Sequence, residues 1–178
     1  RSSLNTSQLP SENMCSIAIR LRYGAFDYFS GGDLPGVVRF GSPAWNDVET
    51  PVSKVVGPVD VHILDHHGNR DSQNDNLLAA LRPRVFVIPV WSSDHPGHDV
   101  LDRMYSQDIY PGDRDVFATD MLEANKLVIG ELLNRLKSDK GHIVVRVAPG
   151  GATYQVIILE DSKENMAVKG VFGPYQSR

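Results

Sequence analysis

Apolar and polar residues alternate with a period of two in several short segments of the chain. The clearest of these is 59–65, V-D-V-H-I-L-D, which ends in the turn His66-His67-Gly68. Alternation of this kind is typical of a strand with one buried face. Residues 16–23 and 26–29 alternate in the same way on either side of Gly24, which predicts a hairpin. Further strands are predicted at 85–90 and 115–119, and a second hairpin at 142–148 and 153–160 around P-G-G.

Three other segments have the longer period of an α-helix. Residues 74–82 predict a short helix that Pro83 stops, and 94–107 predict a second. Residues 120–137 predict the longest helix, because Asp120 and Glu123 have capping-box spacing ahead of an apolar stripe. Residues 35–58 are proline-rich and show little periodicity. Strands that alternate with helices predict an α/β (α+β) protein in which one mixed sheet carries helices on one face.

The length and composition fit one globular domain. The chain has 178 residues, of which 41% are apolar and 22% are charged. We treat 1–178 as a single domain, with residues 1–12 as a polar linker. A net charge of −4 gives no basic surface for a phosphate backbone, so a nucleic-acid partner is disfavoured.

The sequence also argues against several other classes of protein. The single Cys15 excludes an intrachain disulfide framework and a cysteine-rich zinc module. No apolar run has transmembrane length, and the start has no signal-peptide pattern. The compartment stays open, with the cytoplasm slightly favoured. Because the chain begins at Arg1 rather than Met, we expect it to be trimmed or excised from a longer polypeptide.

Candidate metal ligands follow two of the predicted strands. Asp33 follows the first hairpin in the turn G-G-D, and His66 and His67 follow the strand at 59–65. Residues at strand ends face a shared rim, where α/β proteins tend to place ligands. Carboxylate and imidazole ligands suit zinc, with manganese as the alternative. The simpler interpretation is an ordinary Gly-Asp turn and a polar His-His strand cap.

Three stretches resemble the C-terminal half of the metallo-β-lactamase superfamily, in particular the soluble domain of DNA-internalisation competence proteins. Residues 13–34 are similar to the pattern N-x-x-S, apolar strand, Y-G, second strand, T-G-D-L. V-D-V-H-I-L-D-H-H-G-N resembles V-D-V-L-K-V-G-H-H-G-S. The third stretch has two parts. Residues 77–90 resemble L-x-A-L-R-P-x-x-A-V-I-S-V, and residues 95–104 resemble H-P-H-P-x-V-L-x-x-L. The order and spacing of the stretches make the resemblance more specific than any one motif.

The resemblance implies half of an αββα sandwich and gives each matching residue a role. Asp33 would be the carboxylate that bridges two metal ions, and His66 would be the last histidine ligand, with His67 as the fallback. His95 matches the first histidine of H-P-H-P and would lie near the substrate or a leaving group, although no catalytic residue is certain. Gly97 stands where the family has the second histidine, and Gly31 stands in place of the usual threonine.

The family's H-x-H-x-D-H motif, which supplies most of the metal ligands, does not occur in this chain. A catalytic zinc takes about three protein ligands. We therefore expect a partner, covalent or separate, that supplies the N-terminal half of the fold, and a chain that is inactive alone.

Joined to that half, the chain would be a metal-dependent hydrolase of a small-molecule or ester substrate. The alternatives are a non-catalytic binding or structural module with a lost site and a competence-type nuclease. An isolated half would also expose an apolar sheet face and an unpaired edge.

Other residues have simpler interpretations. His95 and His98 have the i, i+3 spacing of a metal-binding pair. A separate metal site is the weaker interpretation of this spacing, because both residues lie at a predicted helix start. Trp45 and Trp91 are interpreted as packing or rim residues rather than as a platform for substrate.

Overall fold

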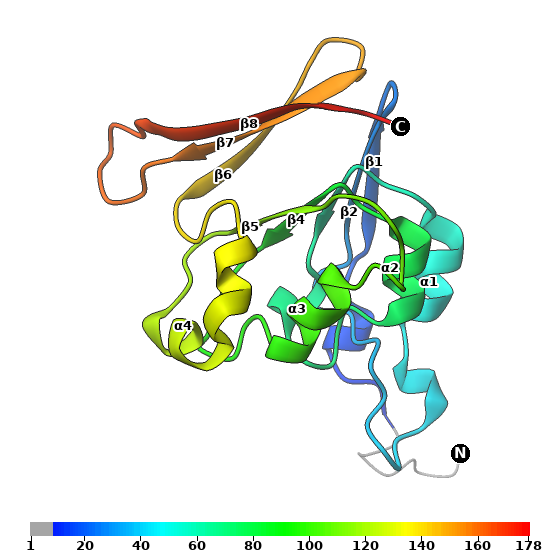
Figure 1. Cartoon of the computed structure of the whole chain (residues 1–178). Helices are drawn as coiled ribbons and strands as arrows, with labels where there is room; N and C mark the ends of the chain where they lie inside the picture. Colours follow the sequence, from blue (N-terminus) through cyan, green and yellow to red (C-terminus); the bar gives the residue numbers. More distant parts are fainter. Residues whose placement is uncertain (1–8) are drawn as a thin grey trace.

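The computed structural model describes residues 9–178 and contains two sheets, with helices packed on one of them (Figure 1). The first sheet comprises β1 (Ile19–Tyr23), β2 (Phe26–Ser30), β3 (Val61–Ile63), β4 (Val85–Ile88) and β5 (Asp115–Ala118). The second comprises β6 (His142–Val147), β7 (Thr153–Leu159) and β8 (Val168–Gln176). The helices are α1 (Glu49–Val56), α2 (Asp75–Leu81), α3 (His98–Tyr105) and α4 (Glu123–Ile129).

The five strands of the first sheet follow the chain order. β1 and β2 form an antiparallel hairpin, whereas β2, β3, β4 and β5 run parallel to one another. The carboxyl ends of β2 to β5 therefore lie at one edge of the sheet, which is where α/β proteins place ligands. The predicted α+β class is confirmed, and the sheet is mixed as expected.

Alternation along the strands separates the layers. Phe86 and Ile88 of β4 are buried against the helices, whereas Val85 and Val87 are buried against the second sheet. Residues from all four helices pack on the first of these faces. Figure 1 shows β6, β7 and β8 lying across the opposite side, so strands β2 to β5 are covered on both faces, whereas β1 stays exposed. This explains why β4 reads as a continuous apolar run.

The long helix predicted at 120–137 is wrong in its extent. α4 ends at Ile129, where Gly130 has a φ of +63°, and a 3₁₀ segment, Gly130–Arg135, follows. The apolar stripe is nevertheless used, because Ile129 is buried and Leu132, Leu133 and Leu136 pack against the same core. A left-handed glycine ends a helix at little steric cost, which here outweighs a favourable stripe.

Two elements were not predicted from the sequence. α1 lies within residues 35–58, which show little periodicity, and β8 follows the second hairpin. Six of the nine β8 residues are exposed and only Tyr175 is buried, so the strand has no clear alternation of buried and exposed positions.

Two other expectations concern the termini and the membrane. Residues 9–12 of the predicted linker lie outside any helix or strand, and residues 1–8 are outside the described part of the chain. Within residues 9–178, no helix has the length and apolar character needed to span a bilayer.

Candidate metal site

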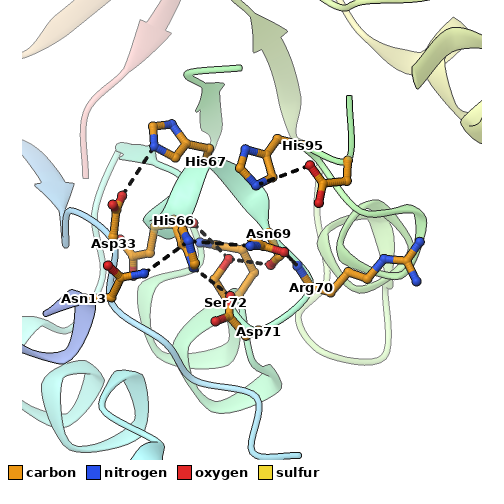
Figure 2. A network of polar contacts seen from close by, with 12 residues as sticks. Asn13, Asp33, His66, His67, Asn69, Arg70, Asp71, Ser72 and His95 are labelled. Atoms are coloured by element: carbon orange, nitrogen blue, oxygen red, sulfur yellow. Dashed lines mark hydrogen bonds and ion pairs between the residues drawn. The ribbon is translucent and has the colours of Figure 1, made fainter. Parts of the chain in front are cut away.

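The carboxyl ends of β2, β3 and β4 bring the candidate residues together (Figure 2). Asp33 follows β2, His66 and His67 follow β3, and His95 lies in the loop between β4 and α3. The ring centroids of His66 and His67 are 6.4 Å apart, and that of His95 lies 6.0 Å from His66 and 5.4 Å from His67. The predicted shared rim is therefore present.

Backbone contacts hold the Asp33 loop beside the histidine turn. The His66 amide donates to the Gly32 carbonyl at 2.8 Å, and the Gly31 amide donates to Asp65 Oδ1 at 2.9 Å. The Asp33 amide donates to Ser16 Oγ at 3.0 Å, which fixes the loop from the other side. Two segments that are more than 30 residues apart in sequence are thus tied together by one main-chain hydrogen bond and by one hydrogen bond from a main-chain amide to the Asp65 side chain.

The histidine turn has an uncommon backbone. His66 has a φ of +47° and His67 one of +57°, and Gly68 continues in the same region with a φ of +78°. Left-handed conformations cost roughly 1–3 kcal/mol each for residues other than glycine, and they gather at functional sites. At Gly68 a Cβ would lie 2.9 Å from the Leu64 side chain, so this position also requires glycine for space.

His67 presents one ring nitrogen to Asp33. Its Nδ1 donates to the Pro89 carbonyl at 2.7 Å, so in the neutral ring Nε2 is the nitrogen available to a metal ion. That Nε2 lies 3.5 Å from Asp33 Oδ1. Two atoms bound tetrahedrally at about 2.0–2.1 Å from one zinc ion lie roughly 3.4 Å apart. The donor types and their spacing therefore fit two ligands of one ion.

His66, by contrast, is held in a polar network. Its Nδ1 lies 2.8 Å from Asp71 Oδ1, and its Nε2 lies 3.2 Å from Asn13 Nδ2 and 3.5 Å from Asn69 Nδ2 (Figure 2). Both ring nitrogens thus have protein partners. The structure directs His67, the fallback ligand, rather than His66 towards Asp33.

His95 is almost fully buried and stacks on His67. The two rings are nearly parallel, with an interplanar angle of 7°. Its Nε2 lies 3.7 Å from Asp94 Oδ1, whereas its Nδ1 is buried without a hydrogen-bond partner among the described residues. Burial lowers the pKa of His95, and the nearby His67 and His66 lower it further against the opposing effect of Asp94.

Two buried carboxyl groups lie beneath the turn, and sequence reasoning missed them. Glu49 accepts the amides of Gln73 and Asn74 at 2.7 Å each, and Asp65 accepts the amide of Gly31. Burial raises the pKa of both carboxyl groups, and the negative charge of Glu49 raises the pKa of Asp65 further. A Cβ at residue 31 would lie 2.5 Å from Asp65 Oδ1, which gives a steric reason for Gly31.

The other sequence candidates are placed differently. His98 pairs with Asp102 at 3.0 Å on the surface of α3, while His95 contacts His66 and His67. Across residues 9–178, no three His, Cys, Asp or Glu side chains gather closely enough to hold one metal ion.

Asp71 was missed as the partner of His66, although its position five residues later in the same turn is a usable local signal.

No family model matches the chain, and no curated protein matches it either. The resemblance to the metallo-β-lactamase superfamily therefore stays a prediction from the order of its motifs.

Proposed function

We propose that this chain is one half of a metal-dependent hydrolase, with Asp33 and His67 as its contribution to the metal site. The observation that carries the proposal is the 3.5 Å separation of His67 Nε2 and Asp33 Oδ1, with His67 Nδ1 bonded to the Pro89 carbonyl. A histidine that ligates a metal usually donates its other ring N–H to a carbonyl or carboxylate. Zinc suits this nitrogen and oxygen pair best, and manganese is the alternative.

Each residue of the site has a separate task in this proposal. Asp33 and His67 bind the ion, and the His66 network with Asp71 holds the turn in shape. His95 is a positioning residue, because its buried ring stacks flat on His67 and fixes the ring plane. When bound, zinc or manganese would supply Lewis acidity for the hydrolysis of a small-molecule or ester substrate.

The remaining ligands would come from an N-terminal half of the same fold, joined to this chain or separate. Support comes from β1, the edge strand of the first sheet, where Ile19, Leu21 and Tyr23 are each at least half exposed, as is Ile17 just before the strand. The register pairs Leu21 with Tyr28 and Tyr23 with Phe26, both of which face the second sheet. The exposed side chains thus extend an apolar face beyond the part that is covered, as a surface awaiting a partner would.

Zinc binding to the complete native protein, in which this chain stands with its N-terminal half, tests the metal site. We expect equilibrium dialysis followed by elemental analysis to find zinc on that wild-type protein. Loss of a group that orients a ligand costs about 10- to 100-fold in metal affinity, so loss of a ligand costs at least tenfold. Asp33→Asn and His67→Gln should each reduce affinity by that amount, and His66→Gln should reduce it less.

The matched control is His98→Gln, which removes a histidine that also faces an aspartate but lies outside the site. Equal zinc binding by all four variants, or no binding of zinc or manganese to the complete wild-type protein, would reject the metal role. A non-catalytic module of the same fold would then be the better interpretation.

The partner half has its own test, which is the intact mass and N-terminal sequence of the native polypeptide. On the order of 100 additional residues that carry H-x-H-x-D-H, on the same polypeptide or a co-purifying one, would supply the missing ligands. A native chain that starts near residue 1 and is a monodisperse monomer would contradict the partner.

A further inference from the structure

Trp91 is a large apolar residue left open to solvent beside the candidate site. It follows β4 by three residues, on the same edge of the sheet as Asp33 and His67. Its side chain is 77% exposed, although Val90 immediately before it packs against the core. Packing therefore does not account for a tryptophan here, because most of its surface contacts no protein atom.

The indole does contact the site. Its ring centroid lies 6.0 Å from that of His67, with an interplanar angle of 30°. Since His67 is anchored by the Pro89 carbonyl and by the His95 ring, the histidine gives Trp91 a fixed neighbour. The exposed part of the indole then forms an apolar surface next to the pair of His67 and Asp33.

The exposed face of the indole selects the shape of the ligand. An aromatic face stacks best on another flat ring. The neighbouring charges do not select a sign, because Asp33 and Asp94 are exposed on this edge, Arg70 acts on Asp94, and the proposed metal ion would neutralise Asp33. A flat aromatic group therefore fits these surroundings best.

We propose that Trp91 is the platform on which the metal site holds a flat aromatic group of its substrate. This inference rests on the proposed function and adds the substrate class to it. It also revises the sequence interpretation of Trp91 as a packing or rim residue.

The chain has two tryptophans, so binding can be followed on two indole N–H signals in a nitrogen-15 NMR spectrum. Trp45→Phe assigns the signals, and the probe is 2-naphthol. We expect the Trp91 signal to shift with 2-naphthol and to respond much less to cyclohexanol. An aromatic pair contributes about 0.5–1.5 kcal/mol, so Trp91→Ala should weaken 2-naphthol binding roughly 2- to 12-fold, and Trp91→Phe should retain most of it.

Trp45→Ala is the matched control, because Trp45 is also exposed, and its loss should leave the affinity unchanged. Equal shifts of both indole signals, or equal binding of 2-naphthol by wild type and Trp91→Ala, would overturn the platform. Zinc binding measured on the complete wild-type protein separates the two proposals. Zinc binding without 2-naphthol binding rejects only the platform, whereas 2-naphthol binding at Trp91 without zinc or manganese binding rejects the metal-dependent hydrolase.

Discussion

His62 shows how strongly the tertiary environment changes a single residue. Its ring is fully buried on the helix-covered face of β3, where it stacks on Phe29 with centroids 5.5 Å apart. Its Nε2 lies 2.9 Å from Gln73 Oε1, which satisfies one ring nitrogen. Burial lowers the pKa of His62 to about 4, against 6.5 for an ordinary histidine. The imidazole is therefore a neutral core residue.

This burial predicts a pH-dependent term in stability. Between pH 6.5 and 4 the unfolded chain binds a proton on His62 that the folded chain does not. The contribution of neutral His62 to the free energy of unfolding is therefore complete above pH 6.5. It is lost as the pH falls towards 4. The shift corresponds to a loss of roughly 3 kcal/mol.

Urea unfolding at several pH values measures this term as a difference between variants. Glu49 and Asp65 have raised pKa values and contribute slopes of the opposite sign, but they are common to wild type and variant. Wild type should lose stability on acidification relative to His62→Gln, whatever the overall cost of that substitution. Parallel pH profiles for the two proteins would show that His62 titrates normally.

At the scale of elements, Asn74 joins a helix to a loop that lacks regular periodicity. Its side-chain oxygen accepts the Leu77 amide at 2.8 Å and so caps α2. Its Nδ2 donates to the Gly36 carbonyl at 3.0 Å and to Asp47 Oδ1 at 2.9 Å. One buried side chain thus begins α2 and fixes the segment that precedes α1.

We expect Asn74→Ala to reduce the free energy of unfolding by about 2 kcal/mol, because it removes a cap and leaves buried groups without partners. Asn76→Ala is the control: its amide bonds to Thr50 on the exposed side of the same helix start, so its effect should stay within about 0.5 kcal/mol. Chemical denaturation of both variants measures the difference. Similar losses for the two would mean that Asn74 does not couple the elements.

At the scale of the whole molecule, Tyr154 anchors the second sheet on the first. It is buried in β7 and packs edge-on against Phe26 of β2, with ring centroids 5.1 Å apart. The ring centroid of Tyr175 in β8 also lies 5.1 Å from that of Tyr154. The Tyr154 hydroxyl donates to the Asp60 carbonyl at 3.3 Å. Most of its contribution is therefore apolar contact between the sheets.

Removal of this ring should loosen β6, β7 and β8 as a unit. We expect Tyr154→Ala to cost about 3–5 kcal/mol and Tyr154→Phe, which keeps the ring, about 1 kcal/mol. Hydrogen exchange of the second sheet in Tyr154→Ala measures the loosening directly. Unchanged protection of β6 to β8 would show that another contact holds the sheets together.

Local signals were sufficient for much of the fold. The alternation around Gly24 and the turn at Pro149, Gly150 and Gly151 correctly predicted both hairpins. The helix predicted at 74–82 and stopped by Pro83 matches α2 to within one residue at each end. These features succeed because a strand period, a turn or a proline acts on neighbouring residues. The long helix failed at both ends. α4 begins at Glu123, with Leu122 as an N-cap that makes no side-chain hydrogen bond, so the predicted capping box is wrong. The conformation of Gly130, which the stripe does not reveal, ends α4 at Ile129.

The sequence by itself determined that Asp33, His66 and His67 follow strands of one sheet, because strand ends and turns are encoded locally. Only the tertiary structure decided which histidine faces Asp33. His67 does so because its Nδ1 is hydrogen-bonded to the Pro89 carbonyl, 22 residues away. The ring nitrogens of His66 are instead hydrogen-bonded to Asp71 and Asn13. The second sheet over the first, the burial of Glu49 and the exposure of Trp91 also depend on contacts between distant segments, which no local pattern records.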